Sequence, residues 1–225
     1  MKYYSFLIAA LALSLLASCS GENKAAKADV KSAAEAPAIK TDGDSSLKVN
    51  TATSLINWTG SKPAGKHTGT IKISEGEIFL DAGDINGGKF TIDMNSITVT
   101  DLDGEGKANL EGHLKGSKEE NQDHFFNVKK YPTSTFTITK VAKLAGDTEA
   151  THLVYGNLTI KDITKEVGFK ANINTAGGKV KVSTPEFTID RSEFNVTYGS
   201  AKFFDDLKDK VISDDIIFKI DLVAG

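Results

Sequence analysis

The sequence predicts an all-β fold in which eight or nine antiparallel strands form a barrel or a sandwich, with one or two short helices. Three observations support this prediction. Apolar and polar residues alternate along most of the chain after Leu47, as on strands with one buried and one wet face. Short turn signals separate these segments, and the clearest pair, Leu153–Ile173, forms a hairpin around a polar corner at Asp162–Lys165. A lone hairpin is marginal in water, so more sheet or a ligand must cover its apolar face.

The first 18 residues resemble the signal peptide of a bacterial lipoprotein. Lys2 precedes an apolar run, Phe6–Leu16, that is too short to span a bilayer. Leu16–Cys19 then resembles a lipobox, which implies cleavage before Cys19 and lipidation of that cysteine. Cys19 is the only cysteine in the chain, so it cannot form an internal disulfide. The alternative is a plain secretory peptide with a chance cysteine at its cleavage site.

Residues 19–46 are predicted to be the lipidated cysteine followed by a flexible linker. Ser20–Ser46 contains no aromatic residue and is rich in Ala, Lys, Glu, Asp and Ser, the composition of a solvated tether. Such a coil spans about 30 Å on average, and nothing in the sequence predicts that it packs. We expect an exported lipoprotein held to a membrane by its anchor. The outer membrane is favoured because Ser20, and not Asp, follows the cysteine.

The remaining residues, 47–225, form one predicted domain of alternating segments. Turns are expected at Glu75-Gly76 and Asn86–Gly88. The alternation changes phase near Asn95-Ser96, which predicts a bulge or the end of a strand, and Pro185 predicts a kink or an edge. In chain order the predicted strands are Ser54–Gly60, Lys66–Ser74, Glu77–Leu80, Lys89–Thr100, Ser134–Val141, the two arms of the hairpin, Lys179–Asp190 and Asp215–Val223.

Two segments between strands predict short helices. Leu110 and Leu114 stand four apart within a long excursion between strands, and Ser200–Lys210 carries three large apolar residues in an acidic setting. The run Asp101–Gly112 imitates a calcium-binding loop at its first, third and fifth positions. Its twelfth position is Gly112 where the bidentate Glu belongs, so a solvated acidic loop is favoured.

The composition and the motifs argue against several classes of function. The formal net charge of −3 and the lack of a basic stripe do not suit a nucleic-acid-binding protein. The four histidines are widely spaced and none lies beside a cysteine, so we expect no metal site. Nucleophile-elbow, dinucleotide-binding and Walker motifs are also missing from the sequence. An enzyme is therefore the less favoured interpretation.

Five sequence blocks resemble the YceI-like family of exported bacterial proteins, over essentially the whole domain. The resemblance implies an extended lipocalin-like antiparallel β-barrel with an apolar tunnel for a polyisoprenoid or similar amphiphile. Asn195, where the family usually has Gly, and the long loop Gly116–His124 depart from the family pattern at the ends of strands or in loops. The blocks are GHLKG at 112–116, FFNVKKYPTSTF at 125–136, YGNLTIKDITKEVGF at 155–169, FTIDRSEFNVTYGS at 187–200 and LKDKVISDDIIFKIDLV at 207–223.

The apolar residues on the inward phase of the strands are the candidate wall of this tunnel. They can meet the methyl branches of an isoprenoid without hydrogen bonds. They could equally fill the barrel, and patterning alone favours that interpretation because protein interiors are close-packed. The resemblance favours a hollow barrel. The candidate residues are Trp58, Ile71, Ile73, Phe90, Ile92, Met94, Phe136, Ile138, Phe169, Phe187, Ile189, Phe218 and Ile220.

His67 and Arg191 are polar residues in phase with the inward positions, so they are candidate contacts for a ligand head group such as a quinone carbonyl or a phosphate. The alternative is an ion pair between Arg191 and Asp214 or Asp215, with His67 half exposed. Unpaired buried arginines are rare, which favours the ion pair.

The expected function is non-catalytic binding, transport or storage of an isoprenoid-type lipid, polyisoprenoid or quinone-like, in the cell envelope. No cofactor is expected other than this lipid. One alternative is a filled barrel that acts as an interaction or stress-protection module, with the loop Gly116–His124 and the acidic C-terminal helix as its contact surface. A third is an enzyme that acts on the lipid head group through His67 and Arg191. The sequence leaves open whether the domain forms a homodimer.

Overall fold

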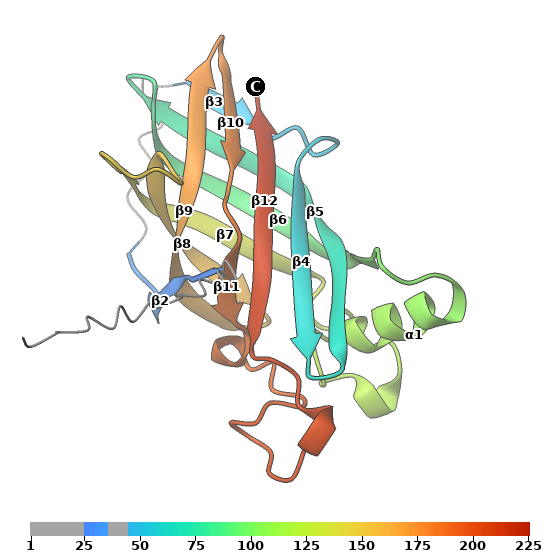
Figure 1. The fold of residues 1–225 in the computed structure, drawn as a ribbon. Coiled ribbons are helices and arrows are strands. Elements are labelled where there is room, and N and C mark those ends of the chain that lie inside the picture. The colour runs from blue at the N-terminus through green and yellow to red at the C-terminus, as the bar shows by residue number, and fades with distance from the viewer. Residues whose placement is uncertain (1–24, 36–44) are drawn as a thin grey trace, which may run out of the picture.

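A computed structural model describes residues 25–35 and 45–225, and Cys19 with its signal segment lies outside them. Eight strands form a closed antiparallel wall in the order β4-β5-β6-β7-β8-β9-β10-β12, and β12 pairs back with β4 (Figure 1). This closure confirms the predicted all-β barrel. The eight strands are β4 Leu55–Lys62, β5 Gly65–Asp81, β6 Asp84–Val99, β7 Thr133–Lys143, β8 His152–Ile160, β9 Ile163–Ala176, β10 Lys179–Ser183 and β12 Asp215–Ala224.

Two predicted turns are wrong, because both segments lie inside strands. Their glycines serve the close approach of neighbouring residues and do not reverse the chain. Glu75-Gly76 lies inside β5, next to an irregularity in its pairing with β6. A Cβ on Gly76 would stand 2.6 Å from the Val49 side chain. Asn86–Gly88 lies inside β6. The reversal occurs instead at Ala82-Gly83, where both residues have positive φ.

Two predicted interruptions are confirmed. The pairing of β5 with β6 jumps between Thr70↔Thr98 and Lys72↔Asp93, so β6 bulges around Asn95-Ser96. Pro185 separates β10 from β11 (Phe187–Asp190), which continues along β12 after the break. The predicted hairpin is also confirmed as β8 and β9, with its tight turn one step earlier, at Lys161-Asp162.

One of the two predicted helices is present. Helix α1 (Gly104–Lys115) packs Leu110 and Leu114 against the barrel and overlaps the calcium-like run, so that run is mostly helix and not loop. Ser200–Lys210 is not a helix. It forms turns and one 3-10 turn, η3 (Lys208–Lys210), because its aromatic side chains stay exposed and no face is buried. Two further 3-10 turns are η1 (Glu119–Asn121) and η2 (Arg191–Phe194).

Part of the predicted linker packs on the barrel, which corrects the expectation of an unpacked tether. Strands β1 (Ala26–Lys27) and β2 (Asp29–Ser32), together the N-terminal strap, pair with β11 and β9 respectively and fill the gap between them (Figure 1). Ala28 is buried at the centre of the strap. The Asn157 side-chain amide then accepts from Ala34 N at 2.9 Å and donates to Ala34 O at 2.6 Å. A short pairing of this kind leaves no trace in composition. A third short strand, β3 (Ser46–Lys48), pairs with β5.

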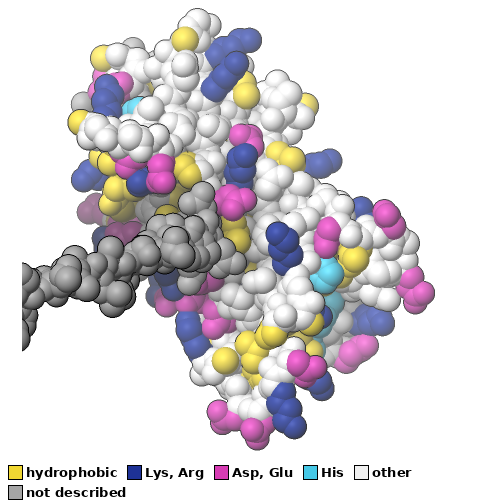
Figure 2. Space-filling view, in the orientation of Figure 1, with side chains coloured by type: hydrophobic (Ala, Val, Ile, Leu, Met, Phe, Trp, Pro, Cys, Tyr) yellow, Lys and Arg dark blue, Asp and Glu magenta, His cyan; other side chains and the backbone are white. Residues whose placement is uncertain are grey.

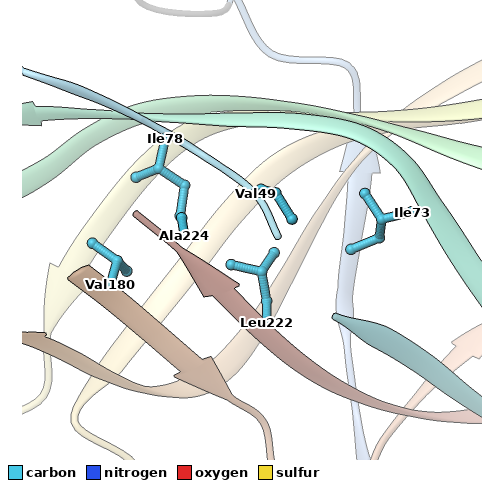
Figure 3. Close-up of a cluster of buried hydrophobic side chains, with 6 residues drawn as sticks. All are labelled: Val49, Ile73, Ile78, Val180, Leu222 and Ala224. Carbon is cyan, nitrogen blue, oxygen red and sulfur yellow. The ribbon is translucent and has the colours of Figure 1, made fainter. Parts of the chain in front are cut away.

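The two ends of the barrel differ. At the end that holds the C-terminus, six apolar side chains meet and close the interior, and we call them the apolar cap (Figure 3). The other end holds Arg191, η2 and the loop that precedes β12. The cap residues are Val49, Ile73, Ile78, Val180, Leu222 and Ala224.

Candidate ligand-binding site

The barrel encloses an apolar cavity of about 170 Å³, which we call the barrel cavity. Of its lining residues only Ser134, Thr184 and Arg191 carry polar side chains. Ser134 Oγ donates to Thr159 O at 2.6 Å, and Thr184 Oγ1 accepts from Ile220 N at 2.9 Å. The wall hydroxyls are thus already bonded to protein, so a ligand here would be held by apolar contact.

Five phenylalanines from five strands line the barrel cavity in an unbroken belt. Their neighbouring ring centroids lie 4.6–6.2 Å apart, and the closest pair, Phe169 and Phe187, is stacked. Aromatic pairs at such separations attract each other beyond their burial. The belt therefore gives one level of the cavity a firm, flat-sided wall. Its members are Phe90, Phe136, Phe169, Phe187 and Phe218.

A second space of about 470 Å³, the side chamber, adjoins the barrel cavity at the Arg191 end. It lies among α1, the β4–β5 hairpin and the segment 196–212, and its wall mixes apolar residues with Lys62, His67, Asp209 and Lys210. The two spaces share six lining residues, so they adjoin each other. These residues are Ile71, Phe126, Arg191, Val196, Ile216 and Phe218.

Arg191 stands between the two spaces, and its side chain is only 4% exposed. Its Nε donates to Ser213 O at 3.0 Å, and its Nη atoms donate to Val196 O at 2.7 Å and Ile212 O at 3.1 Å. Its Nη2 also lies 3.2 Å from Asp214 Oδ1. Burial lowers its pKa, against the opposing effect of the nearby carboxylates. The ion-pair interpretation of Arg191 is therefore confirmed: the guanidinium organises the segment 196–214.

His67 lines the side chamber and not the barrel cavity. Its Nδ1 lies 2.9 Å from Asp101 Oδ2, and the other oxygen of that carboxylate accepts from Thr68 N. The imidazole is half exposed, as the alternative interpretation has it. A head-group contact through His67 remains a prediction.

Helix α1 and the loop after it bring together an aromatic cluster that the sequence did not predict. His113 Nε2 lies 2.9 Å from His124 Nδ1, and the His124 ring stacks on Tyr198 with centroids 4.0 Å apart. Phe125 packs edge-on against His113. Burial, and then the neighbouring His124, lower the pKa of His113 below its usual 6.5. Within the part of the chain that the structure describes, no group of three or more metal-binding side chains forms.

This depressed pKa predicts acid sensitivity. The pKa of this histidine is lower in the folded state than in the unfolded state, so the folded state favours the neutral imidazole. Its contribution to stability is therefore fully present above pH 6.5. That contribution is lost as the pH falls toward the folded-state pKa. An NMR titration should place the His113 midpoint below 6.5. His113→Phe should make the unfolding free energy less dependent on pH in this window. Burial also lowers the pKa of His152, so His152 should account for part of the pH dependence that remains. A midpoint above 6.5 would contradict the prediction.

The structure places the predicted site residues mostly together. Twelve of the thirteen candidate wall residues line the barrel cavity, and Trp58 lines the side chamber instead. Trp58 Nε1 is buried and has no hydrogen-bond partner among the described residues. Sequence reasoning missed Phe125, Phe126 and Tyr198. The only indication of them in the sequence is that they lie within the blocks that resemble the YceI-like family.

An eight-stranded antiparallel barrel with an enclosed apolar cavity and a mixed chamber at one end is a lipocalin-like barrel, a class that can hold one slender ligand. A model of the YceI-like domain family matches residues 47–224, so the chain belongs to the YceI-like family. Protein YceI of Salmonella arizonae is 29% identical over 134 residues, which cover 57% of this chain and 63% of that relative. The chain thus spans less than two thirds of the curated relatives that it matches.

Two solved structures share the fold. BcnA of Burkholderia cenocepacia is 23% identical, with a TM-score of 0.59 that covers 79% of this chain and 99% of BcnA. A polyisoprenoid binding domain from Saccharophagus degradans, implicated in plant cell wall breakdown, is 16% identical with a TM-score of 0.54. That match covers 80% of this chain and 97% of the domain. At these identities the likeness concerns the fold.

Proposed function

We propose that this protein binds an isoprenoid-type lipid, with the tail in the barrel cavity and the head group in the side chamber. The observation that carries the proposal is the pairing of an almost wholly apolar cavity with an adjoining chamber of mixed polarity. An amphiphile has the same two parts in the same order. Family membership and the polyisoprenoid binding domain among the structural relatives support the same ligand class.

The chemistry of the two spaces defines the ligand further. Each buried CH₂ contributes about 0.8 kcal/mol, so a few isoprene units can bind firmly without polar contacts. In the chamber, Arg191 is already engaged with three carbonyls, whereas the Trp58 N–H lacks a partner among the described residues. A head group with a neutral oxygen, such as a quinone carbonyl, would satisfy that donor. No catalytic step is needed for this function.

The cellular part of the proposal concerns transport or storage of this lipid in the envelope. The lipobox-like segment at Leu16–Cys19 supports export and anchoring, with the outer membrane favoured by Ser20. Two or more acyl chains on Cys19 would hold the protein stably at a membrane. In residues 25–35 and 45–225 no helix is both long enough and apolar enough to cross a bilayer.

Native mass spectrometry of the protein purified from its host tests the proposal. We expect a mass increment that organic extraction removes, and an extract that contains a prenyl lipid. A protein that never carries such a lipid, even after incubation with a prenylated quinone in mild detergent, would contradict the proposal. The filled-barrel alternative predicts that negative result, and the two adjoining spaces do not favour it.

A further inference from the structure

The largest exposed apolar side chains of the described residues all lie in one loop. Tyr198, Phe203 and Phe204 are 36%, 57% and 47% exposed, and we call residues 197–210 the aromatic loop. In Figure 2 yellow apolar side chains gather near the lower end of the molecule, among acidic and basic ones. Exposure of two adjacent phenylalanine side chains to water is unfavourable, so a surface of this kind indicates a site of contact with a partner or a membrane.

The aromatic loop lies at the end of the barrel that holds the side chamber. Tyr198, Asp209 and Lys210 line that chamber, and so does Ile212, two residues after the loop. The apolar cap closes the other end, around the last residues of β12. A lipid that enters or leaves through the side chamber would therefore pass the aromatic loop.

The N-terminal strap joins the barrel at this same end. Lys27 Nζ lies 3.4 Å from Asp215 Oδ1 and 3.9 Å from Asp190 Oδ2, and both carboxylates flank Arg191 or its segment. Six residues separate Cys19 from Ala26. Because an extended chain covers at most about 3.6 Å per residue, an anchor at Cys19 would lie within roughly 25 Å of the strap. Such an anchor would place the membrane near the chamber end of the barrel.

We propose that the aromatic loop contacts the lipid bilayer, with Phe203 and Phe204 inserted, so that the side chamber opens toward the membrane surface. This inference rests on the proposed function, since it gives the route by which a membrane lipid reaches the barrel. The loop carries three lysines, Lys202, Lys208 and Lys210, and three aspartates, 205, 206 and 209. Its charges balance, so the contact is apolar and should depend little on the anionic lipid content of the membrane.

A tryptophan placed in the loop tests the contact. The chain has one tryptophan, so Trp58→Phe removes the native tryptophan fluorescence and leaves Phe203→Trp as the only source of that signal. The chain would start at residue 19 with Cys19→Ser, which keeps every described residue and removes the anchor and the apolar run Phe6–Leu16. The matched control is Ala176→Trp, exposed at the β9–β10 turn beside the apolar cap. The probe is a vesicle of phosphatidylethanolamine and phosphatidylglycerol with brominated acyl chains.

We expect a blue shift and bromine quenching for the tryptophan at 203 and neither for the one at 176. In the chain that keeps Trp58, Phe203→Ser with Phe204→Ser should weaken vesicle binding at least about tenfold. The reason is that two aromatic side chains no longer insert into the bilayer. Its melting temperature and its lipid binding in detergent should not change. No quenching at 203 in a chain that does bind lipid in detergent would overturn this inference alone. Lipid uptake is measured in the chain that keeps Trp58. Quenching at 203, together with no lipid uptake by the chain that keeps Trp58, would support the membrane contact and overturn the proposed function.

Discussion

Replacing Val182 by tryptophan is expected to abolish lipid binding while the barrel stays folded. Val182 lies on β10 and lines the barrel cavity, where its side chain is half buried against other wall residues. An indole at this position would occupy space that the lipid tail needs. Loss of one five-carbon isoprene unit costs roughly 4 kcal/mol at about 0.8 kcal/mol per CH₂, or close to a thousandfold in affinity. Native mass spectrometry and a fluorescent prenyl-lipid titration would measure the loss.

The control is the neighbouring residue on the outer face of the same strand. Lys181 is exposed, so Lys181→Trp adds the same ring without entering the cavity. It should bind lipid as the unmodified chain does. If the tryptophan at 182 left affinity intact while the thermal transition was also unchanged, the tail would not lie in the barrel cavity and the proposed binding mode would be wrong.

Replacing Arg191 by alanine is expected to lower the free energy of unfolding by about 3–5 kcal/mol, the usual cost of breaking a buried ion pair by removing one partner. The guanidinium bonds three carbonyls and faces Asp214, whose side chain is 15% exposed. Without it the three carbonyls lose a donor, and the largely buried Asp214 keeps only Ser200 and the more distant Lys202 as partners. Urea unfolding would give the value. The loss should be larger than for any single surface substitution.

Two further variants separate the charge from the packing. Lys165→Ala breaks the partly exposed pair between Lys165 and Glu193, and should cost no more than about 1 kcal/mol. Arg191→Met combined with Asp214→Asn removes the buried charge on both sides, so it should recover part of the loss. A cost for Arg191→Ala as small as that for Lys165→Ala would mean that the segment 196–214 does not depend on the guanidinium.

The N-terminal strap changes how the proposed lipid anchor at Cys19 would be related to the barrel. A free linker from Cys19 to Ser46 would leave the barrel about 30 Å from the membrane in an arbitrary orientation. Because Ala26–Ser32 pairs with β11 and β9, the chain joins the barrel wall only a few residues after Cys19. A lipid anchor at that cysteine would therefore hold one particular end of the barrel toward the bilayer.

The sequence alone determined the wall of the barrel. Alternation with period two assigns the face of each strand locally, so twelve wall residues, the bulge near Asn95 and the break at Pro185 were correctly predicted. The turn signals were less reliable. A glycine such as Gly76 can serve a reversal or a close approach, and only the neighbouring Val49, 27 positions earlier in the chain, shows which.

The tertiary structure decided what no local pattern contains. Whether thirteen inward side chains fill the barrel or surround a space depends on how eight strands close, because the same alternation suits both. The partners of Arg191, the meeting of His113 with His124 and Tyr198, and the docking of Ala28 between β9 and β11 join residues that are distant in the chain. Contacts of this kind arise from the closed sheet and its loops. Period-two spacing predicts the faces of the strands, and only chain closure determines what those faces enclose.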